Sequence, residues 1–154
     1  MGAQTPGLGF QKGWRAATMI GFLLSDRDRA RLAGVHPDLV AVVELAARRY
    51  EPRFMVVEGV RTPERQRELV AKGASQTQNS YHLKQADGWG RAVDLAPLVG
   101  GAIPWSDWTA FQGMADTMKA CAAELRVPLE WGGDWRTLKD GPHFQIPRDW
   151  KVRA

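Results

Sequence analysis

The stretch "RAVDLAP", residues 91–97, decides how this chain is expected to fold. It is an apolar run of strand length, and the Gly-Gly turn that follows predicts that the strand stops at Pro97. One carboxylate, Asp94, lies in the middle of this apolar run. A buried carboxylate is costly unless it is paired, hydrogen-bonded or bound to a cation. The stretch therefore predicts a strand whose acidic residue must find a partner elsewhere in the chain.

Upstream of this strand, the sequence predicts three helices and one further strand. Ser25 is placed to cap a short helix, and Pro37 opens a second helix whose apolar residues repeat at helical spacing. The β-rich run "RFMVVEGV", residues 53–60, predicts a strand. A third helix begins after the cap Thr62 and ends at Gly73.

Downstream, the pattern predicts one long helix and two short strands. Ser106 is the expected cap of the helix, and its apolar stripe consists of Trp108, Phe111, Ala115, Met118, Ala122 and Leu125, with Met114 on the edge. "PLEWGG" (128–133) and "HFQIP" (143–147) are the expected strands. This order of elements lacks alternating βαβ units and favours an α+β domain.

Length and composition indicate one folded domain. The 154 residues are 44% hydrophobic and include 7 Trp and 5 Phe, which excludes a disordered chain. Residues 1–13 hold four Gly and one Pro, so a flexible arm is expected there and the domain is expected over 14–154. The single Cys121 cannot form an internal disulfide.

The net charge of +4 suits a polyanionic partner, but it does not select one. The densest charged block, "SDRDRARL" (25–32), has Asp between its Arg residues and is interpreted as a solvated helix face, so no nucleic-acid partner is expected. The apolar segment 16–24 is too short to span a bilayer and lacks a small-residue cleavage site. We therefore expect neither a signal peptide nor a transmembrane segment, and we expect a monomer.

Two of the three histidines suggest a metal site. His36 precedes a helix start and is expected to be a cap or a surface residue, whereas His82 lies in a polar loop and His143 begins an apolar strand. Zinc in hydrolases usually takes three His or Asp/Glu ligands, and Asp94 would complete such a set. The alternatives are a salt bridge from Asp94 to an arginine, a strand-end cap, and a hydrogen-bonded core histidine at position 143.

A hydrolytic metal site also needs a general base and side chains that line the substrate cleft. Asp140 lies three residues before His143 in the tight turn "DGPH", although Asp is also common in turns for its own hydrogen bonding. Glu130 and Asp134 are rival bases. The aromatic residues that would line a cleft are Trp89, Trp131 and Trp135, and Trp131 fits a core role equally well.

Taken in order, "SYH", "AVDL", "EWGGDW" and "DGPHFQ" resemble the VanY-like zinc peptidases, which include D-Ala-D-Ala carboxypeptidases and L-alanyl-D-glutamate endopeptidases. The segments "GVHPDLVAVVELAA" and "EGVRTPERQRELVAKGAS" are similar to the phage endolysin branch of that family. The resemblance covers about residues 25–147. It implies an α+β fold of the hedgehog/DD-peptidase type, with a small antiparallel sheet flanked by helices.

The resemblance also implies a ligand set. One zinc ion would be held by His82, Asp94 and His143. The segment between His82 and Asp94 is longer than in the usual family pattern, because "LKQADGWGRAV" intervenes. This insertion makes Asp87 a rival ligand, but Asp94 is preferred because it lies in a strand, where alternation fixes the side-chain direction.

The remaining roles come from the same resemblance. Asp140 would be the general base, and Arg61 would bind substrate or the developing oxyanion. Ser80 and Gln66 match positions near the site. The implied reaction is hydrolysis of the peptidoglycan stem peptide, and the endolysin-like segments favour the L-alanyl-D-glutamate bond.

Three other functions stay open at this point. The first is a D-Ala-D-Ala carboxypeptidase, the second is a non-catalytic zinc-binding module of the envelope, and the third is a small basic nucleic-acid binder. For the favoured function, the protein would be made in the host cytoplasm during phage infection and would act on the cell wall.

Overall fold

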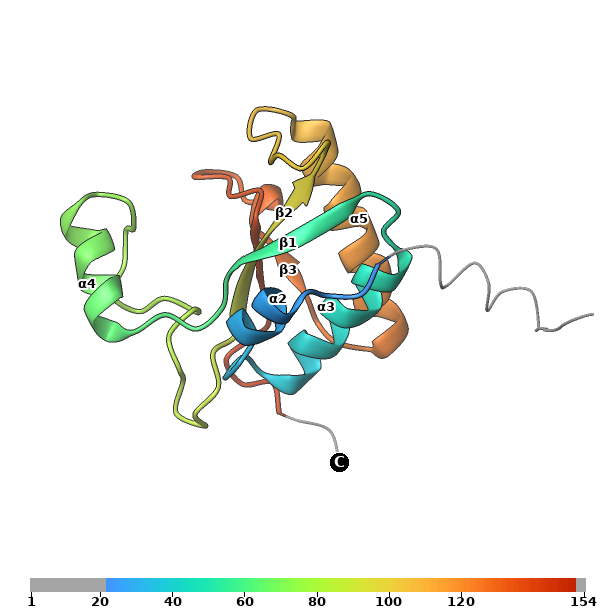
Figure 1. The fold of residues 1–154 in the computed structure, drawn as a ribbon. Helices are drawn as coiled ribbons and strands as arrows, with labels where there is room; N and C mark the ends of the chain where they lie inside the picture. Colours follow the sequence, from blue (N-terminus) through green and yellow to red (C-terminus); the bar gives the residue numbers. More distant parts are fainter. Residues whose placement is uncertain (1–21, 152–154) are drawn as a thin grey trace, which may run out of the picture.

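A computed structural model describes residues 22–151, which form an α+β domain around one antiparallel sheet (Figure 1). The spatial order of the strands is β1-β2-β4-β3, with bounds Arg53–Glu58, Ala92–Leu98, His143–Gln145 and Glu130–Trp131. The helices are α2 (Asp26–Arg31), α3 (Pro37–Arg49), α4 (Pro63–Ala71) and α5 (Trp108–Leu125), with a short 3₁₀ turn, η1 (Gly132–Asp134). The predicted fold class is confirmed. The expected arm over residues 1–13 and the expected domain start at Trp14 lie outside the described residues.

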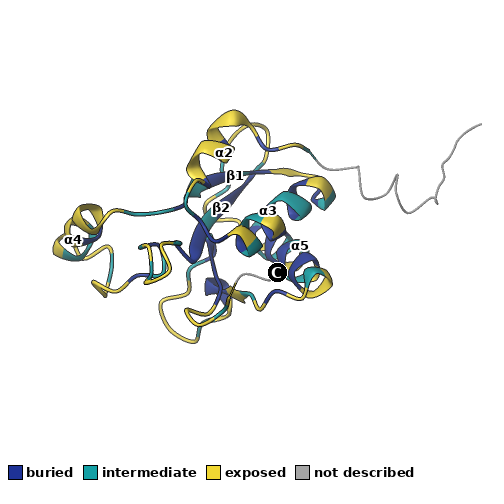
Figure 2. Ribbon diagram, turned by 90° about the horizontal axis from the view of Figure 1, so that it is seen from below, coloured by how far each residue is buried: buried dark blue, intermediate teal, exposed yellow. Residues whose placement is uncertain are grey.

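The core lies where α3, α5 and the sheet meet. The helices α3 and α5 pack against each other, and α5 packs against β2. Their inward-facing residues and the central strands are buried, as the dark blue parts of the ribbon in Figure 2 show. Pro37 opens α3 as predicted, and His36 caps it by accepting a hydrogen bond from the Asp38 amide at 3.1 Å. Because His36 is fully buried, it is a cap but not a surface residue.

The short helix α2 covers the edge of β1 that faces away from β2. Ser25 caps it as predicted, in a capping box with Asp28. The Asp28 carboxylate accepts a hydrogen bond from the Val56 amide at 2.9 Å, and Arg31 donates to the Val56 carbonyl at 2.9 Å. The two side chains thereby satisfy edge groups that would otherwise be open to another strand. The interpretation of this charged block as a solvated face is wrong for Asp28, which is buried.

Two predicted boundaries need correction. β2 does not stop at Pro97 but continues through it to Leu98, with Pro97 opposite Phe54 of β1. Proline is tolerated because this part of β2 lies beyond its pairing with β4, so no strand on that side needs its missing N–H. The cap of α5 is Asp107, one residue later than predicted, because its carboxylate accepts from the Ala110 amide at 3.2 Å.

The stripe of α5 also differs from its prediction at two positions. Met114 is completely buried rather than peripheral, and Trp108 is 46% exposed. The buried stripe therefore begins at Phe111. Within the described residues, no helix is both long and apolar enough to cross a bilayer.

The helix α4 extends away from the sheet, as Figure 1 shows. Thr62 caps it as predicted by accepting from the Arg65 amide at 3.0 Å, and the helix ends shortly before Gly73. Its one buried residue is polar: Gln66 is 1% exposed. We call the segment 61–80, which contains this helix, the α4 lobe. Hydrogen bonds rather than apolar packing hold this lobe to the domain.

Candidate metal centre

The register of the sheet places three acidic or imidazole side chains at one end of β2. Asp94 lies opposite His143 of β4 on one side and opposite Glu58 of β1 on the other. The pairing of β1 shifts between Val56 and Glu58, which is a β-bulge. Bulges redirect a side chain at the end of a strand. Glu58 and Asp94 thus both line the same cleft.

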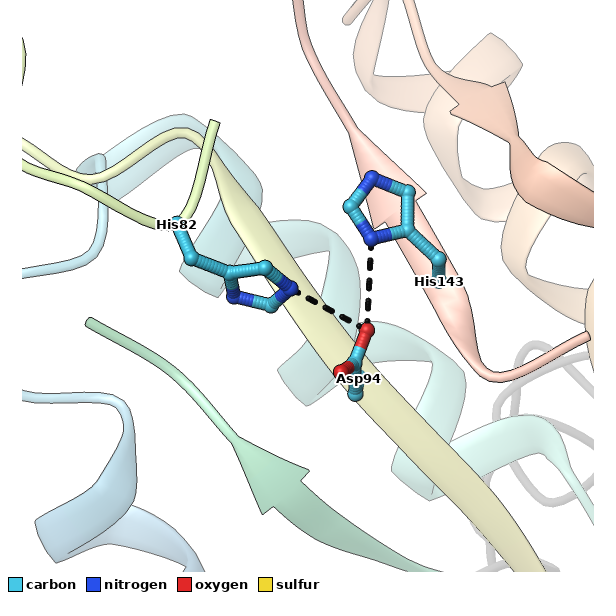
Figure 3. Close-up of side chains that lie close together, drawn as sticks. All are labelled: His82, Asp94 and His143. Carbon is cyan, nitrogen blue, oxygen red and sulfur yellow. Dashed lines mark hydrogen bonds and ion pairs between the residues drawn. The ribbon is translucent and has the colours of Figure 1, made fainter. Parts of the chain in front are cut away.

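His82 joins Asp94 and His143 from the loop after the α4 lobe (Figure 3). The Asp94 Oδ1 lies 3.2 Å from His82 Nε2 and 3.3 Å from His143 Nδ1, and one ligand atom from each residue lies within 4.8 Å of the others. In a tetrahedral zinc site with bonds of about 2.0–2.1 Å, neighbouring ligand atoms are about 3.3–3.4 Å apart. The two separations from Asp94 match that spacing, so the three side chains are placed to hold a metal ion.

The outer nitrogens of both imidazoles are already bonded. His82 Nδ1 lies 2.9 Å from the Gly59 carbonyl, and His143 Nε2 lies 2.7 Å from the Gln145 amide oxygen. Since both partners accept, each outer nitrogen is the one that donates. In a neutral imidazole the inner nitrogen then presents a lone pair. The inner nitrogens of His82 and His143 and the Asp94 carboxylate would then be three acceptor atoms that face one another. This arrangement is unfavourable unless a cation binds between them.

The electrostatics of the site agree with this need for positive charge. Burial by itself raises the pKa of Asp94, but hydrogen bonds from His143 and His82 outweigh burial and hold its pKa well below the usual range. Burial lowers the pKa of His143, whereas Asp94 and Gln145 together raise it above the ordinary value. Without a metal, the neighbouring Asp94 carboxylate therefore favours the protonated form of His143.

Asp140 lies in the wall of the same cleft, whose volume is about 720 Å³. Its amide donates to the Gly132 carbonyl at 3.0 Å, which fixes the turn before His143. A Cβ at Gly132 would lie 2.5 Å from the Asp140 carbonyl oxygen, so only glycine fits there. Burial, followed by the negative charge of Asp94, raises the pKa of Asp140.

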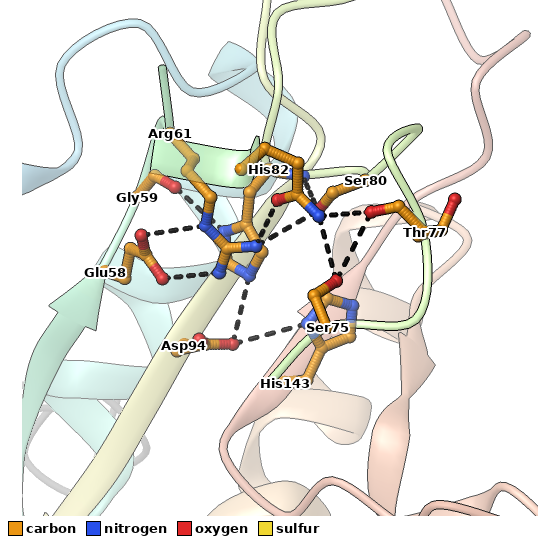
Figure 4. A network of polar contacts seen from close by, with 10 residues as sticks. Glu58, Gly59, Arg61, Ser75, Thr77, Ser80, His82, Asp94 and His143 are labelled. Atoms are coloured by element: carbon orange, nitrogen blue, oxygen red, sulfur yellow. Dashed lines mark hydrogen bonds and ion pairs between the residues drawn. The ribbon is translucent and has the colours of Figure 1, made fainter. Parts of the chain in front are cut away.

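Arg61 is the centre of a polar network beside the cluster (Figure 4). Its guanidinium donates to both Glu58 carboxylate oxygens, at 3.0 and 2.6 Å, and to the Gln66 amide oxygen at 2.7 Å. Gln66 in turn donates to Ser75 Oγ at 2.8 Å and to the Thr77 carbonyl. The burial of Arg61 would lower its pKa, but the hydrogen bonds that it donates to the Glu58 carboxylate raise it. The network fixes a permanent positive charge next to the ligands.

Ser80 is also part of this neighbourhood. Its hydroxyl accepts from the His82 amide at 3.1 Å and lies 3.5 Å from Arg61 Nη1. The structure thus brings Ser80 and Gln66 to the site, where both contact Arg61.

Two of the predicted aromatic residues lie outside the cleft wall. Trp131 is buried, and its indole N–H donates to the Gly141 carbonyl at 2.6 Å, beneath the Asp140 turn. Trp89 packs near His36, with ring centroids 6.5 Å apart. Trp135 does line the cleft.

The rival acidic residues are engaged elsewhere. Asp87 forms an ion pair with Arg91 and accepts from the Trp89 amide at 3.1 Å, and it does not belong to the ligand cluster. Asp134 pairs with Lys119 at 2.7 Å. Glu130 accepts from Trp135 at 2.5 Å and from Gln145 at 3.4 Å, so it supports the residue that orients His143. Within residues 22–151, Asp94 has no arginine partner.

Two residues of the site were missed by reasoning from sequence. Glu58 neutralises Arg61, and its position at the end of a predicted strand was the available signal. Gln145 orients His143, and the two-residue spacing in "HFQ" places both on the same side of a strand.

Comparison with known proteins identifies close relatives. The family model described as phage L-alanyl-D-glutamate peptidase matches residues 20–146. The L-alanyl-D-glutamate peptidase of Escherichia phage T5 is 30% identical over 82% of this chain and 90% of its own length. The peptidoglycan L-alanyl-D-glutamate endopeptidase CwlK of Bacillus subtilis is 30% identical over 60% of this chain and 59% of its own length. The crystal structure of the Serratia marcescens L-Ala D-Glu endopeptidase ChiX superposes with a TM-score of 0.74 at 42% identity, covering 82% of this chain and 91% of that one.

Proposed function

The chain belongs to the phage L-alanyl-D-glutamate peptidase family and is a peptidoglycan endopeptidase, and we propose that it cuts the stem peptide with zinc bound by His82, Asp94 and His143. The observation that supports this proposal most strongly is the ligand cluster: three acceptor atoms lie within 4.8 Å, and both imidazoles are bonded on their outer sides. A buried arrangement of this kind is unfavourable without a cation.

The donor set favours zinc over other ions. Two imidazoles with one carboxylate form a common ligand set of catalytic zinc, which leaves a further position open. Magnesium and calcium prefer oxygen ligands alone. A bound zinc ion would polarise the scissile carbonyl and lower the pKa of water.

Asp140 is the proposed general base. Its carboxylate lines the cleft beside the ligands, and its raised pKa makes it a better proton acceptor than an exposed aspartate. Once protonated, it delivers the proton to the leaving amine of D-glutamate. The Trp131 contact to Gly141 and the close approach of Gly132 fix the turn that holds this carboxylate.

Arg61 is proposed to stabilise negative charge on the substrate oxygen. In Arg61, the Nε hydrogen and one Nη2 hydrogen bind Glu58, and the two Nη1 hydrogens face Gln66 and Ser80. One Nη2 hydrogen therefore remains for the substrate among the contacts of the described residues. Gln66 and Ser80 then position the guanidinium rather than bind substrate. Electrostatic stabilisation by a fixed donor is among the largest contributions to catalysis.

The test is digestion of purified peptidoglycan followed by mass spectrometry of the new termini. Cleavage at the proposed bond yields fragments with C-terminal L-alanine and with N-terminal D-glutamate. Release of free D-alanine would instead indicate the carboxypeptidase. A protein that binds zinc but leaves peptidoglycan intact would be the non-catalytic module.

The proposed substrate also sets where the protein acts, which is the cell wall. The net charge of +4 favours approach to an anionic envelope. Chelation of the metal should abolish digestion, and a peptidase that keeps its activity in excess chelator would contradict the zinc mechanism.

A further inference from the structure

Arg148, which follows β4, presents a fixed guanidinium to the cleft. Its Nε donates to the Gln85 amide oxygen at 2.9 Å, and its Nη2 donates to the Asn79 carbonyl at 2.6 Å. The guanidinium carbon lies 3.9 Å from the centre of the Tyr81 ring, a cation–π contact. Arg148, Tyr81 and Asn79 all line the cleft that contains the metal ligands. Three partners therefore position this exposed planar cation at the cleft.

The other cations of the cleft are engaged differently. Arg61 is neutralised by Glu58 in a two-bond ion pair. Arg65 pairs with Glu68 at 3.2 Å on the exposed face of α4. Lys139 makes a long contact of 3.4 Å to the Gly133 carbonyl and has a flexible stem.

Arg148 differs from these because its three partners are all neutral. No carboxylate lies within 4.0 Å of it in the part of the chain that the structure describes. Its Nη1 group makes no hydrogen bond to any of residues 22–151. A positioned guanidinium whose charge is not neutralised by a carboxylate of the protein is suited to bind a substrate carboxylate, which arginine can hold through two parallel N–H groups.

The substrate of the proposed reaction contains such a group. Glutamate has two carboxyl groups, and extension of the peptide uses only one of them. The residue whose amine belongs to the scissile bond therefore retains a free carboxylate. We propose that Arg148 binds this free carboxylate of D-glutamate and so selects the residue on the leaving side of the bond. This inference rests on the proposed function of the same site.

The expected effect is on binding more than on the chemical step. The carboxylate does not change its bonding during hydrolysis, so its contact with Arg148 should contribute equally to the bound substrate and to the transition state. Loss of a charge-assisted contact of this kind lowers kcat/KM by about 10- to 100-fold, mainly through a higher KM.

The experiment compares two synthetic peptides, one with L-alanyl-D-glutamate and a free carboxylate, the other with that carboxylate converted to its carboxamide. Each is assayed with the zinc-loaded wild type, with Arg148→Gln and with Arg65→Gln. The wild type should cleave the free acid about 10- to 100-fold more efficiently than the amide. Arg148→Gln should lose that preference, and Arg65→Gln, which changes another cleft arginine, should keep it.

The preference ratio separates substrate binding from a structural role. Arg148→Gln also removes the contacts to Gln85 and Asn79 and could make this side of the cleft less rigid. Such a structural change would lower cleavage of both peptides equally. Bound zinc and the melting temperature are measured for each variant to confirm that the site is intact. A preference that survives in Arg148→Gln, or a wild type that cleaves both peptides equally, would overturn this inference alone. A wild type that cleaves neither peptide at this bond would overturn the proposed function as well.

Discussion

Two parts of the site are held in place by different interactions: the end of the sheet, which carries Asp94 and His143, and the α4 lobe. Asp94 and His143 lie opposite each other on paired strands whose neighbours, such as Leu95 and Phe144, are completely buried. The α4 lobe, in contrast, has one buried helical residue, Gln66, and that residue makes polar contacts. Two of the three ligands, Asp94 and His143, are thus fixed by the core strands, whereas the side of the cleft around Arg61 is fixed by a few hydrogen bonds. Changes in the two regions should therefore have separable effects on metal binding and on catalysis.

The largest effect is expected at the sheet end. Asp94→Asn removes the anionic ligand, and kcat/KM should fall on the order of 10³-fold or more because the metal supplies several kcal/mol of stabilisation. Bound zinc should fall in parallel, measured by elemental analysis of purified protein. The matched control is Asp87→Asn, which changes the rival acid and should keep zinc and most activity. Zinc lost only from the Asp87 variant would contradict the ligand assignment.

A smaller effect on the same region is expected from the partner of His143. Gln145→Leu removes the acceptor that lies 2.7 Å from His143 Nε2. Loss of such an outer partner typically lowers metal affinity by about 10- to 100-fold. Competition with a chromogenic chelator measures the change. Unaltered zinc affinity would show that the strand alone orients the imidazole.

The contrasting change in the lobe is Gln66→Leu, which removes the hydrogen bonds of Gln66 to Arg61, to Ser75 and to the Thr77 carbonyl. Zinc affinity should stay at the wild-type value, while kcat/KM falls by about 10-fold, because the buried Arg61 side chain loses one of the hydrogen bonds that position it, at a cost of about 1–3 kcal/mol. Hydrogen exchange should become faster in α4 and stay unchanged in β2. Loss of zinc from this variant would mean that the lobe and the ligands are not independent.

The smallest effect is a pH dependence of zinc binding. Because the pKa of His143 is raised in the metal-free site, the metal competes with a proton there. Zinc affinity should therefore fall as the pH decreases through that raised pKa, by at most about tenfold per pH unit for one proton. Calorimetry in buffers of different ionisation enthalpy should detect proton release. Binding without proton release would contradict the proton on His143.

How far the sequence predicted the site depends on the range of the contacts involved. His82, Asp94 and His143 were identified because ordered motifs mark them, and the structure brings them together. Local cap signals likewise placed α3 and α4. The Glu58–Arg61 pair depends on a bulge, and the burial of Trp131 depends on a contact to Gly141. Such features arise from register and tertiary packing, which local patterns do not encode.

The most direct test is a titration of zinc into metal-free protein while cleavage of an L-alanyl-D-glutamate peptide is followed. We expect no cleavage at the start, activity that rises in proportion to added zinc, and a plateau at one ion per chain. Asp94→Asn should stay inactive throughout the same titration. Full activity in the metal-free wild type, or a titration of Asp94→Asn that matches the wild type, would contradict a catalytic metal held by these three residues.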